Sequence, residues 1–268
     1  MQAQLTPEAI SAAAQLLTNA RKSVDVLSSL GDFEPLDLAS AHAIAEAHAA
    51  SLGWDTIGWK VGCTSQEAME ILNSPGPFAG RIFDGTAYQS GSLHEYAMHN
   101  PGVECEFAFV IGRDLPPRTT MYTVEDVQKA IVAVAPAVEL VAPRFEDFTG
   151  VGVLSLIADS GANAGVVLGE PVKAADCPEL STVAVELTID GSVVSSGTGS
   201  AILGDPWRAL EWLANHLSAR QIGLRAGEFV LSGTCTGIDP LTPGSTATAT
   251  HSGFAPVTVM RTSESHFG

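Results

Sequence analysis

The stretch PGVECEFAFVIGRD, residues 101–114, contains an apolar strand that carries two acidic side chains. Every odd-numbered position from 103 to 111 is apolar, an alternation that predicts one buried face of a β-strand. Residues two apart share a face of a strand, so Glu104 and Glu106 lie side by side on the opposite face. Neighbouring carboxylates repel each other, and burying one without a partner is costly. This strand therefore predicts a β-rich core and indicates a functional site on it.

A third acidic residue, Glu139, lies within a second apolar stretch, PAVELVAP. Three acids in buried strands bind a divalent cation, pair with Lys or Arg, or are protonated; the alternative is a solvated sheet face. The chain has only 13 Lys and Arg residues, and few of them lie in apolar strands. A hard cation with oxygen ligands is the simplest interpretation, and Mg²⁺, with Mn²⁺ as a close substitute, suits such a set.

Lys60 is a further unusual residue, because it lies in the predicted strand TIGWKVGCTS between Gly58 and Gly62 on one face. Neighbouring glycines leave room for a ligand or for another backbone segment. An exposed strand lysine is the structural alternative. The functional interpretation is a cation that orients a carboxylate or transfers a proton.

The pattern along the chain predicts an α+β fold with two regions. Residues 1–55 are Ala-rich and helical, with a first helix capped at Thr6 and a second running from a cap at Ser40 to Gly53. Residues 56–268 form a β-rich catalytic domain with inserted helices, and the whole is one structural unit because no long linker separates the regions.

Several local elements of the β-rich region follow from the same signals. The stretch 73–85 is a predicted loop because of its Pro and Gly content, and 123–136 is a predicted helix. A hairpin turns at Asp190–Gly191, and a helix begins after Asp205.

Composition limits the partners and the compartment. The formal net charge of −17 argues against nucleic acid or anionic membrane surfaces as partners. The four cysteines are widely spaced, which indicates reduced thiols rather than a zinc or redox motif. The sequence shows no signal-peptide pattern and no apolar run long enough to span a membrane, so we expect a cytoplasmic protein.

Together these residues resemble the hydratase/decarboxylase branch of the fumarylacetoacetate hydrolase superfamily. The similarity extends over residues 55–240, in the order of the family. The early lysine, the Glu-x-Glu strand and the later lone glutamate are more specific as a set than singly. The similar segments are GWKVGCTS, PGVECEFAFVIGRDLP, PAVELVAPRFED, IADSGANAGVVLG, SSGTGSAILGDPWRALEWLA and GEFVLSGTCTG.

The resemblance implies that Glu104, Glu106 and Glu139 hold Mg²⁺ or Mn²⁺ and that Lys60 acts beside the metal. It also implies a fumarylacetoacetate-hydrolase-like core, a mixed β-roll or barrel, in a homo-oligomer. Association with a related decarboxylase or hydratase subunit is left open. The loop ADSGANAG differs from the ADNAS more usual in relatives, and the ending GTCTGIDPLTPGS differs from their GALG.

The resemblance further implies a small 2-oxo or 2-hydroxydienoic acid as substrate, from the catabolism of aromatic compounds. The leading hypothesis is a lyase that hydrates 2-hydroxypenta-2,4-dienoate to 4-hydroxy-2-oxopentanoate. The alternative is decarboxylation of 4-oxalocrotonate, which a basic pocket residue such as Arg81 or Arg144 would favour. Hydrolysis of an acylpyruvate carbon–carbon bond and an inactive partner subunit are less favoured. No motif places the His–Glu pair that the hydrolase needs, and the intact set of site residues argues against the inactive subunit.

Further polar residues are candidates for the same site, each with a turn or cap role as the structural alternative. The predicted catalytic residues besides Lys60 are Asp84, Asp159 and Ser160. The predicted substrate-binding residues are Ser196, Gly197 and Thr234.

Overall fold

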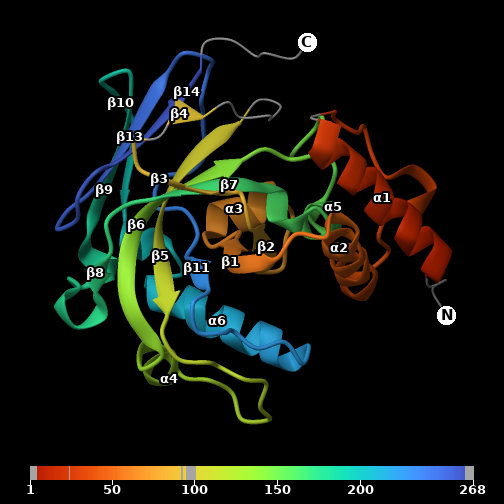
Figure 1. Ribbon diagram of the computed structural model, residues 1–268, viewed down its shortest axis with the longest axis horizontal. Helices are drawn as coiled ribbons and strands as arrows, with labels where there is room; N and C mark the ends of the chain where they lie inside the picture. Colours follow the sequence, from red (N-terminus) through yellow and green to blue (C-terminus); the bar gives the residue numbers. More distant parts are fainter. Residues whose placement is uncertain (1–4, 24, 92, 95–100, 263–268) are drawn as a thin grey trace.

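The computed structural model describes residues 5–23, 25–91, 93–94 and 101–262, and it confirms the predicted α+β fold (Figure 1). The helices are α1 (Pro7–Ser23), α2 (Leu38–Leu52), α3 (Gln66–Ile71), α4 (Val124–Gln128), α5 (Val153–Ala158) and α6 (Pro206–Ala219). The strands are β1 (Thr56–Gly62), β2 (Phe78–Phe83), β3 (Ala87–Gln89), β4 (Leu93–His94), β5 (Gly102–Ile111), β6 (Ile131–Val141), β7 (Asn163–Leu168), β8 (Val172–Lys173), β9 (Ala184–Ile189), β10 (Ser192–Thr198), β11 (Phe229–Leu231), β12 (Asp239–Pro240), β13 (Thr246–His251) and β14 (Val257–Arg261).

The strands form two sheets, and β5 lies in the middle of the larger one. That sheet has the order β2-β1-β11-β5-β6-β7-β3, with β12 pairing with β5 and β8 with β6. The smaller sheet has the order β10-β9-β13-β14-β4. Because β5 and β6 pair antiparallel along almost their whole length, their side chains form one continuous surface.

The main hydrophobic core lies on the odd-numbered face of β5, as the alternation predicted. Phe107 and Phe109 on this face pack with apolar side chains of α6 and of the smaller sheet. Figure 1 shows the smaller sheet on one side of β5 and β6 and the helices α1, α2 and α5 on the other. The face that carries Glu104 and Glu106 is therefore turned away from the main core.

The N-terminal helices form largely as predicted. Thr6 caps α1, accepting a hydrogen bond from the backbone N–H of Ala9, and Gly53 ends α2 with φ 68°. The predicted cap at Ser40 was wrong: Asp37 is the N-cap of α2, and Ser40, at the third helical position, completes its capping box. The division at residue 55 stays a prediction, and α2 packs on α5 across it.

The helix predicted over 123–136 was wrong beyond its first turns. Thr123 does cap a helix, but α4 ends at Gln128 and the β-branched run that follows enters β6. Pro136 lies opposite Phe107 of β5, whose N–H and carbonyl bond Ser232 instead. On the other edge, β8 pairs up to Val134 and β7 only from Ala137, so no strand there needs the missing N–H of Pro136.

The loop predicted over 73–85 was also wrong, because residues 78–83 form β2. Gly80 suggested a loop, but it marks a close approach instead: a Cβ there would lie 2.0 Å from the carbonyl oxygen of Ser160. The hairpin at Asp190–Gly191 is confirmed, with φ 51° and 80° at the two turn residues.

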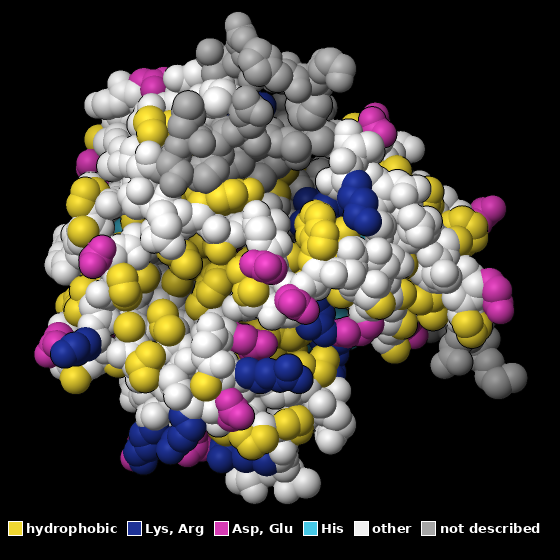
Figure 2. All heavy atoms as spheres, viewed as in Figure 1, with side chains coloured by type: hydrophobic (Ala, Val, Ile, Leu, Met, Phe, Trp, Pro, Cys, Tyr) yellow, Lys and Arg dark blue, Asp and Glu magenta, His cyan; other side chains and the backbone are white. Residues whose placement is uncertain are grey.

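The surface shows charge of both signs. On the face drawn in Figure 2, Lys and Arg side chains lie scattered among acidic and apolar ones rather than in one patch. None of the helices in the described part of the chain has the length and apolar character needed to cross a membrane.

Candidate active site

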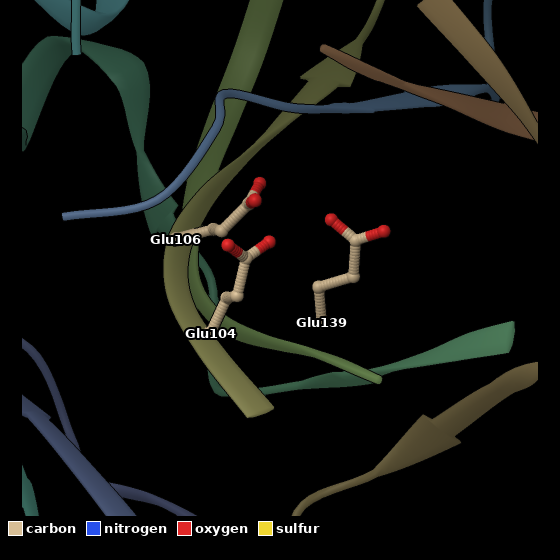
Figure 3. A group of neighbouring side chains, drawn as sticks. All are labelled: Glu104, Glu106 and Glu139. Carbon is tan, nitrogen blue, oxygen red and sulfur yellow. The ribbon is translucent and has the colours of Figure 1, made fainter. Parts of the chain in front are cut away.

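The three glutamates meet on one face of the large sheet. Glu104 on β5 lies directly opposite Glu139 on β6 in the strand register, and Glu106 lies two residues further along β5. Each offers a carboxylate oxygen within 4.8 Å of the others, and the exposed fractions are 7% for Glu104 and 0% for Glu106 and Glu139. Figure 3 shows their carboxylates directed toward one common space. Like charges directly opposite each other destabilise a strand pair, so this arrangement requires a compensating charge.

Protein groups satisfy only part of this cluster. The Oε1 atom of Glu139 lies 3.3 Å from Nζ of Lys60 and accepts a hydrogen bond of 3.0 Å from Nδ2 of Asn163. The Oε2 atom of Glu106 accepts a 2.8 Å hydrogen bond from the N–H of Gly233. Buried Oε1 of Glu106 and Oε2 of Glu139 meet no hydrogen-bond donor among the described residues. Three oxygen donors with two such unpartnered atoms fit a hard divalent cation.

Lys60 is held beside this cluster from β1. Its ammonium donates a 3.2 Å hydrogen bond to the carbonyl of Gly161 and lies 5.6 Å from the ring centre of Phe78. Residues 160–162 have positive φ values of 55°, 68° and 61°, a run of left-handed backbone that is costly outside glycine. This turn directs the Gly161 carbonyl at Lys60, so the strained backbone helps to fix the ammonium.

The electrostatics of the metal-free cluster follow from burial. Burial, and then Glu139, raise the pKa of Glu104 to about 7, while Lys60 opposes the shift. Burial and the two neighbouring glutamates also raise the pKa of Glu106 well above its usual range. Burial lowers the pKa of Lys60, but the three glutamates together raise it above its ordinary value. Lys60 is therefore a cation at neutral pH, and without a metal the cluster retains protons.

These shifts predict a pH dependence of stability in the metal-free protein. Between pH 4.5 and pH 7 the Glu104 carboxyl is protonated in the folded state and ionised in the unfolded state, so folding takes up a proton. The free energy of unfolding therefore falls as pH rises through this window, by about 3 kcal/mol for this group. In urea unfolding with a chelator present, the free energy of unfolding of Glu104→Gln should increase relative to that of the natural protein from pH 4.5 to pH 7. Parallel pH profiles for the two proteins would contradict the shift, and Glu67→Gln serves as the control.

The cluster opens into a cavity of about 750 Å³. Lys60, Glu104 and Glu106 line it, together with the predicted substrate-binding residues Ser196 and Gly197. A Cβ at position 197 would lie 1.9 Å from a backbone carbonyl oxygen, that of Cys235, so glycine is required there by close packing.

Thr234, the third predicted substrate-binding residue, also lines the cavity. Its Oγ1 accepts hydrogen bonds from the N–H groups of Thr236 (3.2 Å) and Gly237 (2.9 Å), so its hydroxyl stabilises the turn after β11. The structure thus places all three predicted substrate-binding residues at the cavity.

The other predicted catalytic residues are placed differently. Asp84 is exposed in the turn after β2, where its Oδ1 accepts a hydrogen bond from the N–H of Gly85. Ser160 is buried, and its hydroxyl meets no hydrogen-bond partner in the described part of the chain. Neither residue is among those that line the cavity, although Gly161, next to Ser160, is.

Asp159 is buried in an ion pair rather than at the cavity. Its Oδ1 lies 2.7 Å from Nε of Arg144, and its Oδ2 accepts a 2.9 Å hydrogen bond from the Arg144 backbone N–H. Arg81, the other candidate for binding a second carboxylate, pairs with Glu46 at 2.6 Å and lies 4.4 Å from the ring centre of Trp59. Neither arginine lines the cavity.

Sequence reasoning missed three groups that position the site: Asn163, Gly161 and Gly233. Asn163 is completely buried at the start of β7, and its backbone carbonyl accepts hydrogen bonds from Arg21 (2.9 Å) and Arg144 (3.1 Å). A buried asparagine in the apolar stretch after IADSG was the available signal, since buried amides are usually bonded. The two glycines act through their backbone atoms, and every residue has these, so the sequence gives no signal for them.

Comparison with known proteins gives the family. The model of the fumarylacetoacetate (FAA) hydrolase C-terminal family matches residues 85–260. The chain is 34% identical to 2-keto-4-pentenoate hydratase of Paraburkholderia xenovorans over 245 residues, which cover 90% of each protein. It is 27% identical to 4-oxalocrotonate decarboxylase of a Pseudomonas species over 262 residues, covering 96% of this chain and 98% of the relative.

A solved structure agrees with these sequences. The 4-oxalocrotonate decarboxylase of Pseudomonas putida, complexed with magnesium and adipate, superposes with a TM-score of 0.89 at 27% identity, covering 96% of this chain and 98% of that one. The predicted resemblance is therefore confirmed for sequence and for fold. The chain belongs to the fumarylacetoacetate hydrolase family, in the branch that contains hydratases and decarboxylases.

Proposed function

We propose that the protein is a metal-dependent hydratase that converts 2-hydroxy-2,4-dienoates to 4-hydroxy-2-oxo acids. The observation that carries the proposal is the buried cluster of Glu104, Glu106 and Glu139 with Lys60 beside it, open to a cavity. The identity of 34% to a hydratase, against 27% to a decarboxylase over a similar share of the chain, favours hydration.

The three glutamates would hold Mg²⁺, or Mn²⁺ in its place, through oxygens that include the two unpartnered ones. The ion, when bound, supplies a Lewis acid that stabilises negative charge on the 2-oxygen of the substrate. The magnesium in the decarboxylase relative supports this choice of ion. Asn163 and Lys60 both hold Oε1 of Glu139, and so direct its Oε2 to the cation side.

Lys60 is the proposed proton-transfer and carboxylate-binding residue. Two of the three N–H groups of its ammonium are directed to Glu139 and to the carbonyl of Gly161. The third would serve a ligand in the cavity, either as a donor to the substrate carboxylate or as the proton source when the dienol becomes a ketone. Hydroxyls of Ser196 and Ser200 line the same cavity and would hydrogen-bond the substrate or the added water.

The proposal has a direct test. Purified protein treated with a chelator is mixed with 2-hydroxypenta-2,4-dienoate, and the ultraviolet absorbance of the dienol is followed with and without added Mg²⁺. We expect loss of absorbance only with the metal, with 4-hydroxy-2-oxopentanoate as the product. Turnover of 4-oxalocrotonate to CO₂ without hydration of any dienoate would replace the hydratase with the decarboxylase. No turnover of either acid would support a non-catalytic subunit.

A further inference from the structure

We infer that the site accepts 2-hydroxydienoates that end in an uncharged apolar chain and discriminates against those that end in a second carboxylate; the inference rests on the proposed function. Positive charge is scarce at the cavity. All 13 Lys and Arg residues lie within the described residues, and Lys60 alone of them lines the cavity. Lys60 already contacts the glutamate cluster, so no other cation of this chain is placed to pair with a distal carboxylate.

The remaining charge at the cavity is negative. Among the described residues that line the cavity, the one charged residue outside the cluster and Lys60 is Glu67, on α3. An adjoining hollow of about 260 Å³ has Glu146 as its charged lining residue. Both are acids, so a carboxylate at the far end of a substrate would be repelled rather than bound.

The cavity has an apolar wall, built from α3, the residue after it and two loops. Its members are Ala68, Ile71, Leu72, Phe148 and Ile238. Ile71 and Ile238 are 59% and 45% exposed, so both side chains are accessible to the apolar chain of a ligand in the cavity.

The cavity is larger than a five-carbon substrate requires. A cavity of about 750 Å³ falls in the range that holds drug-sized ligands, and a five-carbon acid at the glutamate cluster would fill only part of it. The adjoining hollow shares Val141, Phe148 and Ile238 with the main cavity. The cavity lining thus combines two glutamates of the cluster, polar residues that include Ser196 and Ser200, and the apolar wall.

Binding of unreactive 2-oxo acids tests the inference apart from catalysis. Isothermal titration calorimetry on the full chain with Mg²⁺ compares 2-oxopentanoate, 2-oxohexanoate, 2-oxooctanoate and 2-oxohexanedioate. Each buried methylene should tighten binding roughly fourfold. We therefore expect 2-oxooctanoate to bind at least tenfold more tightly than 2-oxopentanoate. The two six-carbon acids differ only in the second carboxylate, and 2-oxohexanedioate should bind at least tenfold more weakly than 2-oxohexanoate.

A charge placed on the apolar wall should change this preference. Ile71→Arg adds a cation where the side chain is already exposed, and it should bring 2-oxohexanedioate to equal or tighter binding than 2-oxohexanoate. Met121→Arg adds the same charge at a residue that is 72% exposed and does not line the cavity, and it should change nothing.

Three results would overturn the inference: no binding of any of these acids, no dependence on chain length, or equal binding of the dicarboxylate by the unaltered protein. Its failure is separate from that of the proposed function. Hydration of the five-carbon dienoate without these binding preferences would contradict only the inferred preference for an apolar chain. The binding preferences without hydration would contradict only the proposed reaction.

Discussion

Glu139→Gln should lower kcat/KM for the dienoate roughly 10³-fold, about the effect of removing one preorganised electrostatic group from an active site. Glutamine keeps the size of the side chain, so the hydrogen bond with Asn163 can persist through the amide oxygen. The negative charge that faces Glu104 across the strand pair is lost, and with it one of the proposed anionic ligands of the cation. Affinity for Mg²⁺ should fall together with activity.

Two measurements separate this effect from unfolding. Calorimetric titration with Mg²⁺ should show strong binding to the natural protein and to Glu67→Gln, a cavity-lining control outside the cluster, and weak binding to Glu139→Gln. In a chelator, urea unfolding should show that Glu139→Gln still folds cooperatively, although with lower stability than the natural protein, because the buried ion pair with Lys60 is broken from one side. Unchanged Mg²⁺ affinity in Glu139→Gln would remove this residue from the ligand set.

Asp159→Asn should cost about 3–5 kcal/mol of stability, the usual effect of breaking a buried ion pair from one side. Asp159 is 0% exposed and Arg144 6% exposed. Burial, and the neighbouring charge of Arg144, lower the pKa of Arg21 to about 9, while Asp159 raises it. One carboxylate thus serves two guanidinium groups, and asparagine would leave both without an anion.

Thermal unfolding measures this effect, with an expected fall in Tm of roughly 6–20 °C for a chain of this size. Asp84→Asn is the matched control, since Asp84 is exposed in a turn and should change stability by no more than about 0.5 kcal/mol. If Asp159→Asn kept its stability but lost activity, Asp159 would regain the catalytic role that the sequence suggested. The same outcome for Asp84→Asn would assign a role to that residue.

Much of the site could be predicted because strands alternate. The period of two separates the apolar face of β5 from Glu104 and Glu106, and no knowledge of neighbouring strands is needed for that step. Lys60 could be singled out because glycines flank it on its own face. Two elements were predicted wrongly for local reasons. Pro136 suggested a helix end, but it lies in a strand at the gap between β8 and β7, and Gly80 suggested a loop where another backbone segment comes close.

What could not be predicted depends on register and on distance. The sequence does not say that Glu104 lies opposite Glu139, since one residue of slip would turn Glu139 away. Nor could the sequence place Asp159 and Ser160. Asp159 forms a buried ion pair with Arg144, and Ser160 lies next to it. The same holds for Arg81 and Arg144, which only the folded chain assigns to acidic partners away from the cavity.

The hydrogen bond from Arg21 to the carbonyl of Asn163 links the first helix of the chain to the residue that holds Glu139. A change in α1 can therefore alter how Glu139, a proposed ligand of the cation, is held, although α1 contributes no side chain to the cavity lining. For evolution, this means that substitutions in α1 and substitutions around Glu139 constrain each other. Substitutions that affect the site can therefore arise in α1, which lies far along the sequence from the residues that line the cavity.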